Sequence, residues 1–251
     1  MGSDRRKPEY VAVIDTSVTV SGVVSHFWDT SRTVSNMVAP YMARPSSETI
    51  SPFGEYPTAT LQIADHDVAD GPRSSAMELV SAPATSELAA ELDGAASWLD
   101  VTADALLLAA LGRTIARVIG EGVTAVDVTD DRRWLLHAVP LICATAQQAS
   151  ATEVLADVHR ALATAPSYAA DAASEILLNY VGAVPEGTMP IHETPPGLGH
   201  ALEVRVYSSG ELLHIDWWYD TARFDSYTVD ELAEQFGLAL IEMTSDAAAP
   251  L

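Results

Sequence analysis

The hydrophobic pattern of the chain is strongest at residues 175–182. Residues 176–178 are all apolar, the run resumes at Tyr180, and Gly182 closes it. An apolar run of this length that ends at a glycine is typical of a strand in the middle of a sheet. Asn179 places an amide within the run. Because a buried amide needs hydrogen-bond partners, we expect Asn179 to bond to the backbone across the sheet.

Alternating and helical patterns predict the other elements. Residues 201–207 and 211–219 alternate on either side of Ser208-Ser209-Gly210, which predicts a hairpin. Thr102 is a suitable N-cap for a long apolar helix that follows it. The remaining expected elements are strands at 10–20, 58–63, 76–82 and 123–128, and helices at 22–42, 102–119, 151–162 and 228–243, with one more opening at 83–85. Loops are expected at 44–57 and 185–199. This mixture predicts an α/β fold, a mixed β-sheet with packed helices.

Composition restricts the classes of function. The 251 residues include 35 acidic and 13 basic side chains, for a formal net charge of −22. This acidity argues against binding to nucleic acid or to an anionic membrane surface, since both favour a basic face. A single cysteine, Cys143, forms no intrachain disulfide and no cysteine-rich metal site. No apolar run approaches the roughly 20 residues of a membrane span, and no signal peptide is recognisable. We therefore expect a cytoplasmic protein without metal or cofactor.

Four motifs in the second half of the chain resemble the C-terminal lobe of the condensation and epimerization domains of nonribosomal peptide synthetases. Residues 176–182, ILLNYVG, are similar to the FNYLG element of these domains. The other motifs are DALLLAALGRTIARVIGEG at 104–122, DVTDDRRW at 127–134 and LLHIDWWYDTARFDSYTVDELAEQFGLALIEM at 212–243. Their order and spacing carry the resemblance, which covers about residues 76–245. It implies a single lobe of the chloramphenicol-acetyltransferase-like fold.

The resemblance also implies how the chain is organised. It implies a divergent N-terminal segment at 10–75 and a condensation-domain-like C-terminal lobe at 76–251. Before them, the chain itself predicts a disordered leader at 1–9. A condensation domain is a pair of such lobes with the catalytic tunnel between them. A lone lobe exposes the face that meets its neighbour, and a two-fold homodimer would cover that face. The alternative is a separate N-terminal lobe that completes a split domain.

One loop resembles the family's His-His-x-x-x-Asp-Gly motif, which lies at the tunnel. Residues 65–71, DHDVADG, match it except at the first histidine. The resemblance makes His66 a candidate general base and makes Asp70 the residue that organises the loop, by bonding to backbone or to Arg73. The alternative is a polar turn between two strands, a role that suits Asp and Gly.

A second loop corresponds to the Glu-Gly-His-Gly-Arg motif of epimerization domains. Alignment of residues 127–134 places Thr129 at the family's glutamate, and threonine is not a base at neutral pH. Asp131, or the adjacent Asp130, is the carboxylate that could replace it, although charged residues in such a turn are usually solvated. Arg133 corresponds to the family's arginine, as an ion-pairing residue or a ligand contact.

An aromatic cluster on the last predicted strand is a candidate contact for a ligand or partner. With period 2, Trp217 and Tyr219 share one face, while Asp216 and Trp218 share the other. If the first face is core, an exposed Trp218 could bind a ligand, as could Asn179. The other histidines carry weaker signals. His137 has apolar neighbours that suggest a core position, and His192 and His200 flank a Pro/Gly-rich loop and are not assigned as metal ligands.

Three functions remain open. The first is an accessory protein in a nonribosomal peptide or polyketide natural-product pathway that binds an intermediate tethered to an acyl- or peptidyl-carrier protein, or the released product. The second is a small enzyme performing cyclization, acyl transfer or proton transfer with His66 or the acids at 130–131. The third is a non-catalytic module that recruits a tailoring enzyme.

Overall fold

The computed structural model describes residues 59–67, 76–129, 135–165, 167–169, 174–185 and 200–250. All of them belong to one compact unit, Ile50–Leu251. The elements expected between residues 1 and 57, and the leader at 1–9, lie outside the described residues. The helices are α1 (Ser86–Leu99), α2 (Ala103–Val118), α3 (Ala151–Thr164) and α4 (Ser226–Asp246). The strands are β1 (Met77–Ser81), β2 (Gly122–Thr129), β3 (Leu135–Cys143), β4 (Ser167–Ala169), β5 (Ile176–Val184), β6 (Leu202–Ser209) and β7 (Leu212–Asp220).

The described strands form one mixed sheet in the order β1-β7-β6-β5-β2-β3-β4. The pairs β2–β5 and β5–β6 are parallel, and the other neighbours are antiparallel. The predicted central strand is thus confirmed as β5, and the predicted hairpin as β6–β7. Gly182 does not end β5. It has a φ of 73°, in the left-handed region that favours glycine, and lies at a register shift after which the strand continues to Val184.

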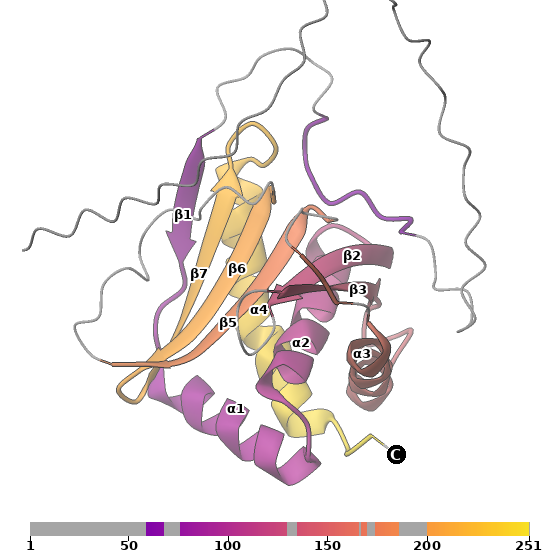
Figure 1. Cartoon of the computed structure of the whole chain (residues 1–251), viewed down its shortest axis with the longest axis vertical. Coiled ribbons are helices and arrows are strands. Elements are labelled where there is room, and N and C mark those ends of the chain that lie inside the picture. Colours follow the sequence, from indigo (N-terminus) through magenta and orange to yellow (C-terminus); the bar gives the residue numbers. More distant parts are fainter. Residues whose placement is uncertain are drawn as a thin grey trace, which may run out of the picture. The chain divides into compact units, whose positions relative to one another are not determined.

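The two faces of the sheet differ in chemistry. One face packs against the helices, and α4 passes behind β7 and β6 in Figure 1. Along β6, Leu202, Val204 and Val206 belong to this apolar core. Because side chains alternate along a strand, Glu203 and Arg205 lie on the opposite face. We call the opposite face the polar face. Its polar and aromatic side chains include Ser81, Asp127, Thr129, Asn179, Glu203, Arg205, Tyr207, His214, Asp216 and Trp218, and Leu177 lies on the same face.

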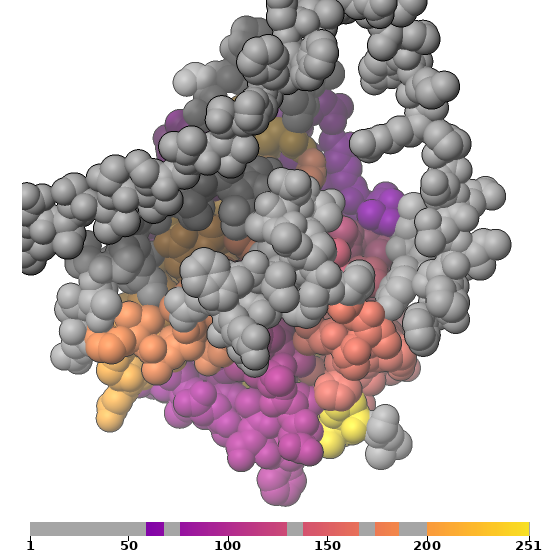
Figure 2. All heavy atoms as spheres, in the orientation of Figure 1, coloured from indigo at the N-terminus to yellow at the C-terminus, as the bar shows by residue number. Residues whose placement is uncertain are grey.

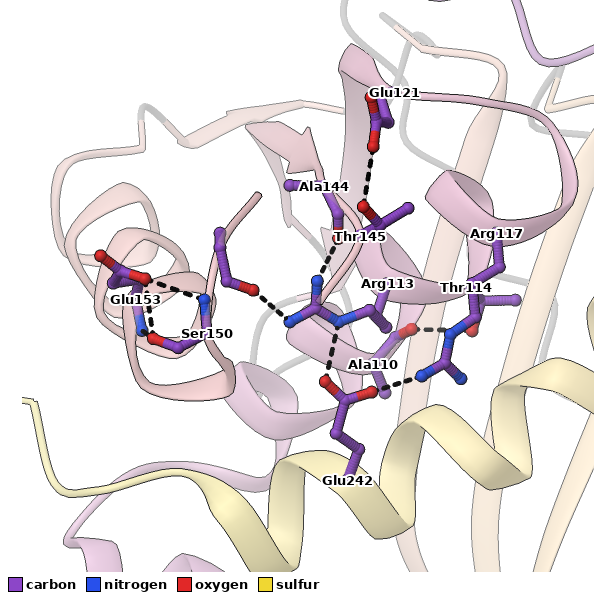
Figure 3. Close-up of polar contacts among 11 residues, drawn as sticks. Ala110, Arg113, Thr114, Arg117, Glu121, Ala144, Thr145, Ser150, Glu153 and Glu242 are labelled. Atoms are coloured by element: carbon purple, nitrogen blue, oxygen red, sulfur yellow. Dashed lines mark hydrogen bonds and ion pairs between the residues drawn. The ribbon is translucent and has the colours of Figure 1, made fainter. Parts of the chain in front are cut away.

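Helix α2 is the centre of the helical layer. Thr102 accepts a hydrogen bond from the Ala105 backbone N–H at 3.3 Å, so the predicted N-cap is confirmed. The Arg113 side chain is fully buried and spans three elements (Figure 3). Its guanidinium donates to the carbonyls of Ala144 and Ala149, between β3 and α3, and its Nε lies 3.0 Å from Glu242 Oε1 on α4. The buried charge is therefore compensated by groups that it also holds in place.

Helix α1 forms the lower surface of the molecule in Figure 2, where it is drawn in magenta. Its Trp98 is 86% exposed. Within the described residues, no single helix is long and apolar enough to cross a membrane. Helices α1 and α2 pass that test only together, and they are bent by 111° at their junction.

The strand predicted at 58–63 is wrong over its described part, 59–63. This segment forms no ladder, because the N–H groups of Thr60 and Leu61 both donate to one acceptor, the Val123 carbonyl. Segment 59–67 is instead fixed at its two ends. The His66 N–H donates to the Arg223 carbonyl, just before α4.

Gly112 provides a test of the helix-to-sheet packing. A Cβ at this position would lie 2.9 Å from the Ile142 carbonyl oxygen of β3, so Gly112→Ala forces α2 and β3 apart. We expect this overpacking to lower the free energy of unfolding by about 1–3 kcal/mol, measured by urea denaturation. The matched control is Gly94→Ala on α1, where a Cβ meets no atom within 4 Å. It should raise stability by about 0.5–1 kcal/mol, because alanine is the better helix former. If Gly112→Ala raised stability as Gly94→Ala does, the close approach of α2 to β3 would be contradicted.

Candidate functional site

A row of polar side chains crosses the polar face of the sheet. Asn179 on β5 is paired in register with Arg205 on β6, which is paired with Asp216 on β7. Ser81 on β1 faces Asp216, and the Thr129 hydroxyl on β2 lies 3.5 Å from Asn179 Oδ1. Strands of an all-apolar core would have no such row. Its position on the face opposite the helices makes this surface the candidate site.

Glu203 is the acceptor at the centre of this surface. Its Oε1 accepts from Arg205 Nε at 2.8 Å and from Asn179 Nδ2 at 3.0 Å. The side chains of Glu203 and Arg205 are only 4% and 8% exposed. The ion pair is thus largely removed from water, and its second donor, the Asn179 amide, helps to offset the cost of burying the carboxylate.

Trp218 lies beside this ion pair. The Arg205 guanidinium carbon is 5.8 Å from the centroid of the Trp218 ring, within the range of a cation–π contact. Trp218 is 6% exposed, and its indole Nε1–H has no hydrogen-bond partner in the described part of the chain. A buried donor without a partner is costly, so it is a place where a ligand oxygen would be stabilised.

Asp216 is held by hydroxyl groups. It accepts from Ser81 Oγ at 2.6 Å and from the Tyr207 hydroxyl at 3.3 Å. The Tyr207 ring stacks on His214 with centroids 4.8 Å apart. Burial, and next the Asp216 carboxylate, raise the pKa of Tyr207 to about 12. The phenol therefore keeps its proton and remains a donor at neutral pH.

A histidine–aspartate pair lies at the edge where β5 and β6 begin. His200 Nε2 is 2.8 Å from Asp127 Oδ2, and the two side chains are 4% and 0% exposed. The Ser174 backbone N–H donates to the same carboxylate oxygen at 3.3 Å. Because a carboxylate only accepts, this contact places the ring proton of a neutral His200 on Nε2.

His66 belongs to a different cluster, at the start of α4. Its Nε2 lies 3.1 Å from Asp225 Oδ1, with side chains 30% and 67% exposed. Its carbonyl accepts from Arg223 Nε at 3.1 Å, and Arg223 also pairs with Glu175, directly before β5. The neighbouring Asp65 accepts from the Asp225 N–H and the Thr228 hydroxyl. This placement connects segment 59–67 to the first turn of α4.

The structure brings together two of the residues selected from the sequence. Asn179 and Trp218 lie on opposite sides of the Glu203–Arg205 pair. Two details of the prediction were wrong. Asn179 bonds to side chains rather than to backbone, because it points out of the sheet at the polar row. Trp218 shares a face with Asp216 as predicted, but it is buried rather than exposed.

Several candidates fall outside what the structure describes. Asp70, Asp131 and Arg133, together with Asp130, lie beyond the described residues, and so does the side chain of His137. The hydrogen bonds of His66 lead to Arg223 and Asp225 at the start of α4 rather than to the polar row. Among the described residues, no group of three or more His, Cys, Asp or Glu side chains is arranged to hold a metal ion.

Sequence reasoning missed Asp127 and His200 as a pair. The two residues are 73 positions apart, so no local motif connects them. A usable signal was present in Asp127 itself, the one charged residue in the alternating stretch 123–128. A charge within a predicted strand next to the central strand needs a partner on the same face.

Comparison with known proteins finds relatives of this chain among polyketide synthases. No family model matches the chain. One of the subunits of the phenolphthiocerol/phthiocerol polyketide synthase of Mycobacterium tuberculosis is 34% identical over 76% of this chain, and its counterpart from Mycobacterium bovis is equally similar. The match covers 16% of these relatives, so the chain spans only a small part of their length.

The solved structures with similar folds include domains of nonribosomal peptide synthetases. The epimerization domain from the third module of tyrocidine synthetase B has a TM-score of 0.59 and 16% identity, with 74% of this chain and 51% of that chain covered. The EpoB cyclization-docking bidomain from Sorangium cellulosum has a TM-score of 0.57 and 13% identity, with 77% of this chain and 46% of that chain covered. The first condensation domain of the CDA synthetase has a TM-score of 0.50 and 18% identity, with 73% of this chain and 48% of that chain covered. The resemblance seen in the motifs is thus confirmed: this chain has the fold of condensation-type domains and spans about half of their length.

Proposed function

We propose that this chain is a condensation-type lobe of a natural-product assembly pathway that binds an acyl intermediate tethered to a carrier protein. The observation that carries the proposal is the 34% identity to a polyketide synthase component, in a chain with the fold of nonribosomal peptide synthetase domains. By analogy with the family, we take the lobe to be the C-terminal one and residues 76–251 to be its extent.

The polar face supports a binding role. A tethered acyl chain carries thioester and amide carbonyls, and a carbonyl oxygen accepts hydrogen bonds. The unpartnered Trp218 N–H is a buried donor of the kind that such a carbonyl satisfies. The nearby Arg205 charge is already compensated by Glu203, so the surface selects a neutral polar chain rather than an anion.

Replacement of Trp218 tests this binding role. Trp218→Phe keeps an aromatic ring and removes the N–H, so we expect affinity for octanoyl-pantetheine to fall about two- to tenfold, the value of one hydrogen bond. Isothermal titration calorimetry measures it. The matched control is Trp98→Phe on the exposed surface of α1, which should bind as the unmodified protein does. Equal affinity of the two variants would exclude Trp218 as the donor, and absence of binding by the unmodified protein would exclude the proposed function.

We further propose that a second lobe completes the site. Support comes from the solved structures, in which this fold occupies about half of the chain. A second copy of this chain is the occupant we favour, since two-fold pairing needs a single sequence. Light scattering at micromolar concentration should give twice the monomer mass. A monomer over the whole concentration range would contradict the homodimer and favour a separate lobe.

An enzymatic role through His66 is the alternative raised by the loop at 65–71. The exposed pair with Asp225 and the backbone contacts to Arg223 support a structural role instead. We expect His66→Ala to bind octanoyl-pantetheine normally. Asp65→Ala should lower the free energy of unfolding by about 0.5–1 kcal/mol, because it removes a negative charge from the N-terminus of α4. Calorimetric titration measures the binding, and thermal melting measures the stability. If a folded His66→Ala variant turned over the thioester about 10²-fold or more slowly, His66 would be a general base after all.

A further inference from the structure

We propose that His200 is a general base at the edge of the polar face and that Asp127 is its positioning residue. This inference rests on the proposed function, because the substrate is the acyl thioester bound there. The acceptor it would activate is a hydroxyl group. A hydroxyl attacks a thioester slowly unless a base removes its proton during the attack, whereas a free amine needs no such help.

The geometry is that of a base held by an orienting carboxylate. Asp127 Oδ2 accepts from His200 Nε2 at 2.8 Å. This fixes the ring and leaves the lone pair of a neutral imidazole on Nδ1. In the part of the chain that the structure describes, Nδ1 has no hydrogen-bond partner, and it is not among the buried atoms that lack one, so it remains accessible.

Asp127 is itself held firmly. It is fully buried on β2, and the Ser174 N–H donates to the oxygen that binds His200. The carboxylate thus keeps its position whether or not the imidazole is charged. A buried negative charge beside Nε2 also stabilises the imidazolium that forms when Nδ1 takes a proton.

The register of the sheet relates this pair to the proposed binding surface. Asp127 is paired with Leu177, Leu177 with Glu203, and Glu203 with Trp218. These four residues form one row on the polar face. With strands roughly 4.8 Å apart, the two ends of the row are separated by about 14 Å. A long tethered chain can therefore contact Trp218 at one end and present its reacting carbonyl near His200 at the other.

The proposed step is an acyl transfer. The acceptor hydroxyl gives its proton to His200 Nδ1, and its oxygen forms a bond to the thioester carbonyl carbon. The carbon–sulfur bond then breaks, and the leaving thiolate takes the proton from the imidazolium. The products are an ester and a free thiol, or a carboxylic acid when water is the acceptor. No oxidant, reductant or further reactant is needed.

The test uses the full chain with octanoyl-pantetheine as donor and water as acceptor, followed by colorimetric detection of the released thiol. His200→Ala should lower the rate by about 10²–10⁴-fold. Added imidazole should restore part of that rate, which a structural defect would not allow. Asp127→Asn should lower the rate less than His200→Ala does. Both variants should still bind the thioester, as measured by calorimetry. The matched control is His159→Ala on the exposed side of α3, with no expected effect.

Two results would overturn the assignment. One is a rate for the unmodified protein no greater than that of His200→Ala, including no rate at all. The other is a loss of rate that imidazole does not restore and that accompanies a lower melting temperature. In either case, binding of octanoyl-pantetheine by the unmodified protein would leave the proposed function standing, so failure of the two ideas can be distinguished.

Discussion

Burial of charge on the polar face is the constraint on which the sheet depends. Asp127, Glu203, Arg205 and Asp216 are all buried. An uncompensated charge at such a position would cost several kcal/mol, so each needs a partner within hydrogen-bond reach. Arg205 pairs with Glu203 on its own strand, β6. The other partners come from neighbouring strands or from a loop at a strand end, such as Asn179 on β5 for Glu203. A shift of one residue in any of these strands would turn its charges toward the helices, so the pairs fix the register.

The helical layer supports this arrangement from the other side. The same strands present Val204, Val206 and their neighbours to α2 and α4, and apolar burial there holds the sheet against the helices. Arg113 repeats the principle within the layer, where one guanidinium binds the β3–α3 connection and α4 together. A polar face with side chains fixed on strands is preorganised, because its groups need not be reoriented when a ligand arrives.

Much of this fold was predictable, because its strongest signals are local. The apolar run of β5, the turn between β6 and β7 and the long apolar pattern of α2 each depend on neighbours in sequence. The errors have local causes too. Residues 59–63 alternate like a strand, yet they meet a single backbone acceptor, Val123, so no ladder forms. The short β4 carries too few residues for any periodicity. The continuation of β5 past Gly182 depends on a bulge whose register is set by β6.

The candidate site was less predictable, because its contacts join distant parts of the chain. His66 was prominent in the sequence because it stands in a motif-like loop, but the contacts of that loop connect it to the start of α4. His200 had no motif, and only the order of strands brings it to Asp127 across the beginning of β5. A sequence motif indicates a function only where the surrounding structure is the one in which the motif has that function. The buried pair follows from the energetics of this chain itself, since the Asp127 carboxylate would not remain buried without a hydrogen-bond donor. For that reason the His200–Asp127 pair carries more weight than the sequence motif as a guide to the chemistry of this lobe.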